Sequence, residues 1–245
     1  MNLADRMILN LDIYFGEDCS YSEENKYLTI FNRGECLRLL INDDENVTIS
    51  QLNKCKYKGV ENLEKIENMC LHLDVEYLYL EDQSNIEFQG YNINLGLLSI
   101  LSKGDSWYNS LGYKQTNYKK EKLKWNSLRK NSIRDLYGDI LKISLIQYKN
   151  SNKGYFTDGL TIYANIFDEE LDDFNFREFI KNAVLFLEEF IDIDDKIEKV
   201  ALEFTILLKS GKYMDDNLLI CYLIFLSLFE CIVNYTRCPL TKKLK

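Results

Sequence analysis

Apolar and polar residues alternate along the first part of the chain, a pattern typical of half-buried β-strands. Ile8–Phe15 alternates in this way and ends at Gly16, so it is predicted to form a first strand and turn. Tyr27–Phe31 and Glu35–Ile41 flank a short loop that contains one glycine, which predicts a hairpin. Val47–Leu52 follows a run of Asn and Asp and is predicted as a further strand. The expected arrangement is an antiparallel meander.

The spacing of apolar residues then lengthens to three or four. From Leu63 to Leu73 this spacing predicts a helix that lays one apolar stripe on a sheet. Val75–Leu80 follows at once and is predicted as a strand. With Val47–Leu52, this helix and strand form a βαβ unit, in which the two strands are parallel and the connection is right-handed.

The decapeptide Gly104–Tyr113, GDSWYNSLGY, ends a predicted apolar helix at Leu95–Ser102. It brings a Trp-Tyr pair and then Leu-Gly-Tyr, and it is predicted to lead from that helix into a strand. The first part of the chain is therefore expected to be an α/β (α+β) domain over residues 1–118, a mixed sheet with flanking helices.

Residues 119–245 are predicted to form an α-helical domain. Phe179–Phe190 and Ile197–Leu208 each carry one apolar face, and Leu218–Val233 is apolar nearly all round. The last segment is shorter than the roughly 20 residues that span a bilayer and contains Glu230, so it is predicted as a central bundle helix and not as a membrane anchor.

Charge and cysteine content narrow the functional classes. The formal net charge is −9, which argues against a general coat for nucleic acid. The start of the chain lacks the basic and apolar regions of a secretory signal. Seven cysteines without CxxC spacing and a single histidine favour reduced thiols over a disulfide framework or a zinc site. A cytoplasmic location is expected.

A family resemblance is carried by the run Trp107-Tyr108-x-x-Leu111-Gly112-Tyr113. This run follows a meander, a strand, a glycine loop, a helix, a strand and a helix, in that order. It resembles the Leu-Tyr-x-x-x-Gly-Phe run of the GNAT acyl-CoA-dependent N-acetyltransferases, and the resemblance covers residues 1–118. The decapeptide also resembles stretches in uncharacterised proteins of giant DNA viruses, which would place the chain in the host-cell cytoplasm.

The resemblance implies a role for Tyr108. In the family, the corresponding tyrosine lies near the sulfur of CoA and serves as general acid toward the leaving thiolate. The alternative is that Trp107 and Tyr108 are packing aromatics at a helix end, and aromatic pairs usually have that role.

The resemblance also implies a pyrophosphate-binding turn, whose nearest match is the segment from Lys56 to Glu61. Glu61 stands where the family has Gly or Ala, and its carboxylate would repel a pyrophosphate at a helix N-terminus. Glu61 is therefore predicted to cap the helix, and no cofactor is expected. If the chain is active, acetyl-CoA would bind at Lys56, Lys58, Gly59 and Val60.

The segment Lys114–Arg134 is the one strongly basic stretch of this acidic chain. It either contacts RNA, where aromatic stacking adds to phosphate attraction, or is the solvated face of a connecting helix. The candidate RNA contacts are Lys119, Lys120, Lys122, Lys124, Trp125, Arg129 and Lys130.

Other catalytic or metal-binding arrangements are weak. His72 and Cys70 lie two positions apart on a predicted helix, so their side chains face different ways and form no dyad. The acidic residues near the ends of the C-terminal helices lack calcium-loop spacing and are predicted as helix caps. They are Asp192, Asp194, Asp195, Asp215 and Asp216. No metal is expected.

The function expected from the sequence is that of a non-catalytic or catalytically impaired GNAT-like scaffold. It would act through a protein partner or through RNA, without a membrane. Two alternatives stay open, an active acetyl-CoA-dependent N-acetyltransferase and an RNA-binding factor that uses Lys114–Arg134.

Overall fold

A computed structural model of the chain describes residues 1–53, 55–56, 58–81, 84–150, 158–167, 176–233 and 239–245. These residues form two units, and neither unit is continuous in sequence. Unit 1 is Met1–Asp82, Leu111–Thr116 and Cys238–Lys245, and unit 2 is Gln83–Ser110 and Asn117–Arg237. The sequence pattern predicts a single domain boundary after residue 118.

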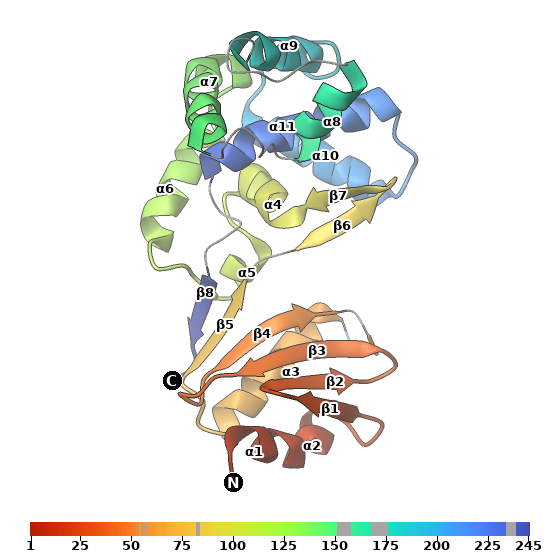
Figure 1. The fold of residues 1–245 in the computed structure, drawn as a ribbon, viewed down its shortest axis with the longest axis vertical. Coiled ribbons are helices and arrows are strands. Elements are labelled where there is room, and N and C mark those ends of the chain that lie inside the picture. The colour runs from red at the N-terminus through yellow and green to blue at the C-terminus, as the bar shows by residue number, and fades with distance from the viewer. Residues whose placement is uncertain (54, 57, 82–83, 151–157, 168–175, 234–238) are drawn as a thin grey trace. The chain divides into compact units, whose positions relative to one another are not determined.

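Unit 1 is built on a six-stranded mixed sheet of order β1-β2-β3-β4-β5-β8 (Figure 1). The strands are β1 (Ser20–Glu24), β2 (Tyr27–Phe31), β3 (Glu35–Ile41), β4 (Val47–Leu52), β5 (Tyr77–Glu81) and β8 (Pro239–Lys243). Strands β1 to β4 pair antiparallel, and for β2, β3 and β4 this is the meander that the alternating pattern predicts. Strand β5 pairs parallel to β4, and β8 pairs antiparallel to β5.

The βαβ unit predicted from the sequence is confirmed. Helix α3 (Gly59–His72) joins β4 to β5, and the two strands are direct neighbours in one sheet. The apolar stripe of α3 supplies Leu63, Ile66 and Met69 to the interior, each at most 2% exposed. The spacing of apolar residues, which lengthens from two positions to three or four, therefore predicted both the helix and the parallel crossover.

The strand predicted over Ile8–Phe15 is wrong, because these residues lie in helices α1 (Leu3–Leu9) and α2 (Leu11–Phe15). The buried apolar residues here recur every fourth position, at Leu3, Met7, Leu11 and Phe15. Leu9 and Ile13, which complete the apparent alternation, are 68% and 70% exposed. The side chain of Asn2 caps α1 by accepting a hydrogen bond from Asp5 N at 2.8 Å.

Two strands of unit 1, β1 and β8, have no local signal in the sequence. Strand β1 reads SYSEE and is exposed at all five positions, so it carries no apolar alternation. Strand β8 lies in a stretch that the sequence analysis assigns to a helical domain, and its Leu240 is fully buried beside β5. A pairing across some 160 positions leaves no local pattern in the sequence.

Unit 2 is mainly helical (Figure 1). It begins with a hairpin of β6 (Asn85–Phe88) and β7 (Tyr91–Asn94). The helices are α4 (Leu95–Lys103), α5 (Trp107–Ser110), α6 (Tyr118–Leu128), α7 (Ile133–Asn150), α8 (Asp158–Phe167), α9 (Phe176–Glu188), α10 (Ile197–Ser210) and α11 (Asp216–Val233).

Helix α11 is the centre of the unit 2 core, as its nearly all-round apolar sequence predicts. It contacts α4, α7, α8 and α9, and its Phe225 and Phe229 are fully buried. No helix among the described residues is both long and apolar enough to cross a membrane.

The decapeptide after α4 ends that helix as predicted. Gly104 has a left-handed φ of 80°, and its N–H donates to Ile100 O at 2.8 Å. The predicted strand after Tyr113 is reduced to one isolated bridge, in which the backbones of Lys114 and Thr241 exchange hydrogen bonds of 2.9 and 3.0 Å. Trp107–Ser110 forms the short helix α5.

Candidate functional site

The first turn of α3 is the segment that would hold a pyrophosphate, and an acidic side chain occupies it. The backbone N–H of Lys58 donates to a carboxylate oxygen of Glu61 at 3.0 Å. Glu61 stands at the third position of the helix, where its charge interacts favourably with the exposed N–H groups. The structure thus places Glu61 in the capping role predicted from the sequence.

One of the two lysines near this turn is paired with an acid. The Lys56 ammonium lies 3.5 Å from a carboxylate oxygen of Asp18, and its backbone N–H donates to Asn32 O at 3.1 Å. Lys58 and Val60 are exposed, and Gly59 is half-buried. The four residues predicted to contact CoA therefore lie together, but with one acid inside the turn and another beside it.

A disulfide holds the loop that leads into this turn. Cys36 on β3 and Cys55 are bonded, with their Cα atoms 5.3 Å apart. The expectation of reduced thiols throughout is wrong for this pair, because the β3–β4 hairpin brings together two cysteines that lie 19 positions apart. Among the described residues the free thiols are those of Cys19, Cys70 and Cys221.

Burial makes two of these thiols poor nucleophiles. It raises the pKa of Cys70 and of Cys221 to about 12, so neither is a thiolate at neutral pH. His72 Nδ1 lies 2.8 Å from the hydroxyl of Tyr14, with which it shares a hydrogen bond. The geometry agrees with the expectation that Cys70 and His72 form no dyad.

Strands β4 and β5 are neighbours over only part of their lengths. Their register joins Val47 to Leu78, Thr48 to Tyr79 and Ile49 to Leu80, and it ends there. Beyond Ile49, β4 remains paired with β3, and the register shift in that pair leaves Ser50 as a bulge. Ser50 and Gln51 are exposed, and among the described residues neither is paired with β5 just before the loop to α3.

Tyr108, the candidate general acid, belongs to unit 2 and so to a different unit from the α3 turn. Its ring centroid lies 4.7 Å from that of Trp107 in an edge-on contact. Trp107 is 37% exposed and Tyr108 is half-buried. This contact is the packing alternative described above, and the position of Tyr108 relative to a thioester stays a prediction.

The aromatic residues of the basic segment point inward. Trp125 and Tyr118 are 2% and 9% exposed, and their ring centroids lie 6.4 Å apart in an edge-on contact. Base stacking needs an accessible ring face, so these two rings serve the core of unit 2 in this structure.

Several cations of the basic segment are already paired. Lys122 and the hydroxyl of Tyr118 donate to the same oxygen of Asp105 at 2.6 and 2.7 Å. Hydrogen bonding to Asp105 raises the pKa of Lys122, and burial raises that of Tyr118. Further ion pairs join Lys124 to Glu121, Arg129 to Glu198, and Arg134 to Glu188 and Asp194. Lys119, Lys120 and Lys130 are exposed.

The acidic residues of the C-terminal helices mostly cap helices or pair with cations. Asp195 forms an ion pair with Lys199, and Asp194 pairs with Arg134. Asp215 accepts hydrogen bonds from the N–H groups of Asn217 and Leu218 at the start of α11. In the described part of the chain, no three metal-binding side chains are grouped.

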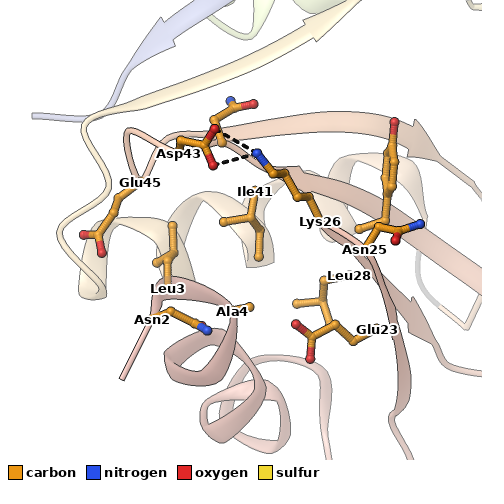
Figure 2. Close-up of a pocket in the computed structure, with 12 residues that line it drawn as sticks. Asn2, Leu3, Ala4, Glu23, Asn25, Lys26, Leu28, Ile41, Asp43 and Glu45 are labelled. Carbon is orange, nitrogen blue, oxygen red and sulfur yellow. Dashed lines mark hydrogen bonds and ion pairs between the residues drawn. The ribbon is translucent and has the colours of Figure 1, made fainter.

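A groove of about 280 Å³ lies in unit 1, between the start of α1, the β1–β2 turn and the β3–β4 turn (Figure 2). Its floor is apolar and its rim is charged. The floor consists of Leu3, Ala4, Leu28 and Ile41, and the rim carries Glu23, Lys26, Asp43 and Glu45. No local pattern in the sequence predicts this groove, because its lining comes from one helix start and two turns that are far apart in the chain.

The charges on the rim of the groove are only partly balanced. Lys26 donates to both carboxylate oxygens of Asp43, at 2.6 and 2.8 Å, as Figure 2 shows. Glu45 accepts from Arg6 at 2.9 Å. Glu23 makes no ion pair with any residue that the structure describes. The groove therefore combines an apolar floor with one uncompensated carboxylate.

Comparison of the chain with protein-family models, with curated proteins and with solved structures finds no match.

Proposed function

We propose that the chain is a catalytically silent binding protein built on a GNAT-like plan, and that it acts through a protein partner. The observation that carries the proposal is the hydrogen bond from Lys58 N–H to the Glu61 carboxylate at the first turn of α3. A helix N-terminus is favourable for an anion because its N–H groups are unpaired and its dipole is positive. Here the N–H group of Lys58 already donates to the Glu61 carboxylate, which occupies the position that a bound anion would take.

Electrostatics and shape both work against pyrophosphate at this turn. Two unit charges 4 Å apart repel by about 1 kcal/mol in bulk water and by about 4 kcal/mol near a protein surface. The helix dipole returns only about 0.3 to 1 kcal/mol to an anion, and Glu61 already receives this stabilisation. A glutamate side chain also prevents the close backbone approach that Gly or Ala allows.

The GNAT-like plan is supported by the order of elements in unit 1. Four antiparallel strands, a helical crossover and a parallel fifth strand follow one another in unit 1, which matches the first part of the order on which the resemblance rests. Helix α4 and Trp107–Ser110, which belong to the last part of that order, lie in unit 2. The plan explains why a loop and a helix N-terminus meet at the place where β4 separates from β5.

An active acetyl-CoA-dependent N-acetyltransferase is the second candidate. Its support is the short β4–β5 register, which among the described residues ends at Ile49 and Leu80 and includes neither of the exposed residues Ser50 and Gln51. A pantetheine arm would enter between these strands. In this alternative the backbone of Gly59 and Val60 holds the phosphates, and Tyr108 is the general acid.

The RNA-binding alternative has less support. The two aromatic residues of the basic segment are buried, and four of its cations are in ion pairs. An RNA factor would rely on Lys119, Lys120 and Lys130, whose contacts with phosphate would be strongly weakened by salt.

Thermal unfolding with and without acetyl-CoA separates the first two candidates. A ligand that binds only the folded state raises Tm in proportion to the logarithm of its concentration. We expect millimolar acetyl-CoA to leave the Tm of the wild type unchanged and to raise that of Glu61→Ala. Glu64→Ala is the matched control, because Glu64 is an exposed acid one turn further along α3. A rise in the wild type that Glu61→Ala does not enlarge would favour the enzyme.

A further inference from the structure

We propose that the groove of Figure 2, together with the open edge of β1, binds an extended basic segment of a protein partner. This inference rests on the proposed function, because it names the chemistry of the partner through which the scaffold acts. Three features of unit 1 carry it: the composition of the groove, the unbalanced charge on its rim and the exposed edge strand beside it.

The groove has the size and composition to receive a long basic side chain. Ile41 is half-buried and offers accessible apolar surface in the groove, and beneath it Leu3, Ala4 and Leu28 belong to the packed core at 2%, 8% and 0% exposure. Its volume of about 280 Å³ lies just below the roughly 300 to 1,000 Å³ typical of pockets for drug-sized ligands. Lysine and arginine bury an aliphatic stem on apolar surface and keep the charge at a polar rim, which is the arrangement found here.

Charge complementarity selects a cationic occupant. The Asp43 and Glu45 carboxylates are paired with Lys26 and Arg6, whereas Glu23 has no cationic partner among the described residues. A basic side chain in the groove would neutralise Glu23 without breaking either existing pair. The acidic rim and the net charge of −9 disfavour a phosphate-bearing occupant.

Strand β1 supplies a backbone surface next to the groove. It is the terminal strand of the sheet and is exposed at all five positions, Ser20–Glu24. In an antiparallel pair alternate residues direct their N–H and C=O groups away from the neighbouring strand, so β1 presents such groups at the open edge. An extended peptide can pair with an edge of this kind and extend the sheet.

Glu23 belongs to both parts of the proposed surface, since it lies on β1 and lines the groove. Tyr21, two positions earlier and on the same face of the strand, is 50% exposed and offers a ring to a second basic side chain. A peptide paired with β1 would direct every second side chain to this face. The preferred partner segment therefore carries basic residues at alternate positions.

Fluorescence anisotropy with the full chain tests the inference. The probe is a short labelled peptide in which lysine alternates with threonine. We expect saturable binding that weakens with salt, and at least about a fivefold loss of affinity in Glu23→Gln, the loss of a charge-assisted contact. Glu24→Gln is the matched control, since adjacent residues of a strand point to opposite faces, and it should change the affinity less than twofold.

Two peptide variants test the two halves of the surface without altering the protein. Replacement of lysine by glutamate should abolish binding, and N-methylation of alternate peptide bonds should weaken it by removing backbone donors. Equal affinity of the wild type and Glu23→Gln would overturn the inference, as would equal binding of the lysine and glutamate peptides or no saturable binding at millimolar peptide. Acetyl-CoA binding decides the proposed function separately, because the peptide assay contains no cofactor.

Discussion

At the scale of single residues, Asp105 shows how a side chain inside the decapeptide organises unit 2. One of its carboxylate oxygens accepts hydrogen bonds from Tyr118 and Lys122 on α6, which follows 13 to 17 positions later. Lys122 was a candidate RNA contact because it lies in a basic run. Its pairing with Asp105 depends on the turn after α4, which the local pattern of charges does not record.

Removal of the Asp105 charge should destabilise unit 2. We expect Asp105→Asn to lower the free energy of unfolding by about 1 to 3 kcal/mol, because two charge-assisted hydrogen bonds to a half-buried oxygen are weakened. Denaturant unfolding of the variant measures this change. Asp139→Asn on the exposed side of α7 is the control, and an equal effect of both substitutions would contradict the role given to Asp105.

The same cluster predicts a dependence of stability on alkaline pH. The folded-state pKa of Lys122 is raised above 10.5 by its hydrogen bond to Asp105, and that of Tyr118 is raised above 10.0 by burial. The folded state therefore binds protons more tightly, and its stabilisation is present below pH 10 and lost as the pH rises through the folded values. Unfolding measured above pH 10 should show a steeper loss of stability in the wild type than in Asp105→Asn.

At the scale of elements, the periodicity of apolar residues predicted those helices and strands whose own sequence carries the pattern of burial. The β2–β3 hairpin, β4, α3 and the central helix α11 all carry one strong pattern over their whole length, and each is present in the structure. Strand β1 and strand β8 were missed because the first is polar throughout and the second depends on β5 for its burial. Residues 3–15 fit both a strand-like alternation and a helix-like spacing of four. The helix forms because Leu3 and Met7 extend the four-residue spacing to positions before Ile8.

The candidate site was predictable only in part, for a related reason. The capping role of Glu61 follows from its place three positions after Lys58 at the start of an apolar stripe, a purely local signal. The disulfide, the end of the β4–β5 register and the groove depend on which strands become neighbours. Strand neighbours are set by tertiary pairing, and the spacing of residue types along a single sequence does not reveal them.

The Cys36–Cys55 disulfide should stabilise unit 1 measurably. The bonded cysteines are separated by 19 positions in the sequence. A cross-link that closes a loop of about this length lowers the entropy of the unfolded chain and so raises its free energy by about 3 kcal/mol. We expect Cys55→Ser to lower the free energy of unfolding by about 2 to 4 kcal/mol, whereas Cys19→Ser changes it little. Alkylation of the denatured, unreduced wild type by iodoacetamide should leave Cys36 and Cys55 unlabelled, and labelling of both would contradict the bond.

At the scale of the whole molecule, the chain leaves unit 1 and later returns to it with two further segments. Residues 111–116 return to supply the buried Tyr113, and β8 returns at the end to cover β5. Unit 1 therefore cannot complete its sheet until almost the whole chain is present. Its scaffold, with the α3 turn, the β1 edge and the groove, consists of segments from both ends of the sequence.

This topology predicts that a residue near the end of the chain controls the stability of unit 1. Leu240 is fully buried on β8, opposite Leu80 of β5. We expect Leu240→Ala to cost about 2 to 5 kcal/mol, the usual cost of a leucine truncation in a core. Lys243→Ala, an exposed position on the same strand, is the control and should cost less than about 1 kcal/mol. Hydrogen exchange of the β5 amides reports where stability is lost, and unchanged protection in Leu240→Ala would contradict the pairing.

The central proposal is that the Glu61 carboxylate at the first turn of α3 prevents acyl-CoA from binding there. Calorimetric titration of the wild-type chain with acetyl-CoA tests it most directly, because a pyrophosphate that enters this turn must displace or endure the Glu61 carboxylate. The account predicts no heat of binding up to millimolar ligand. Saturable binding at micromolar concentration, unaffected by Glu61→Ala, would contradict it.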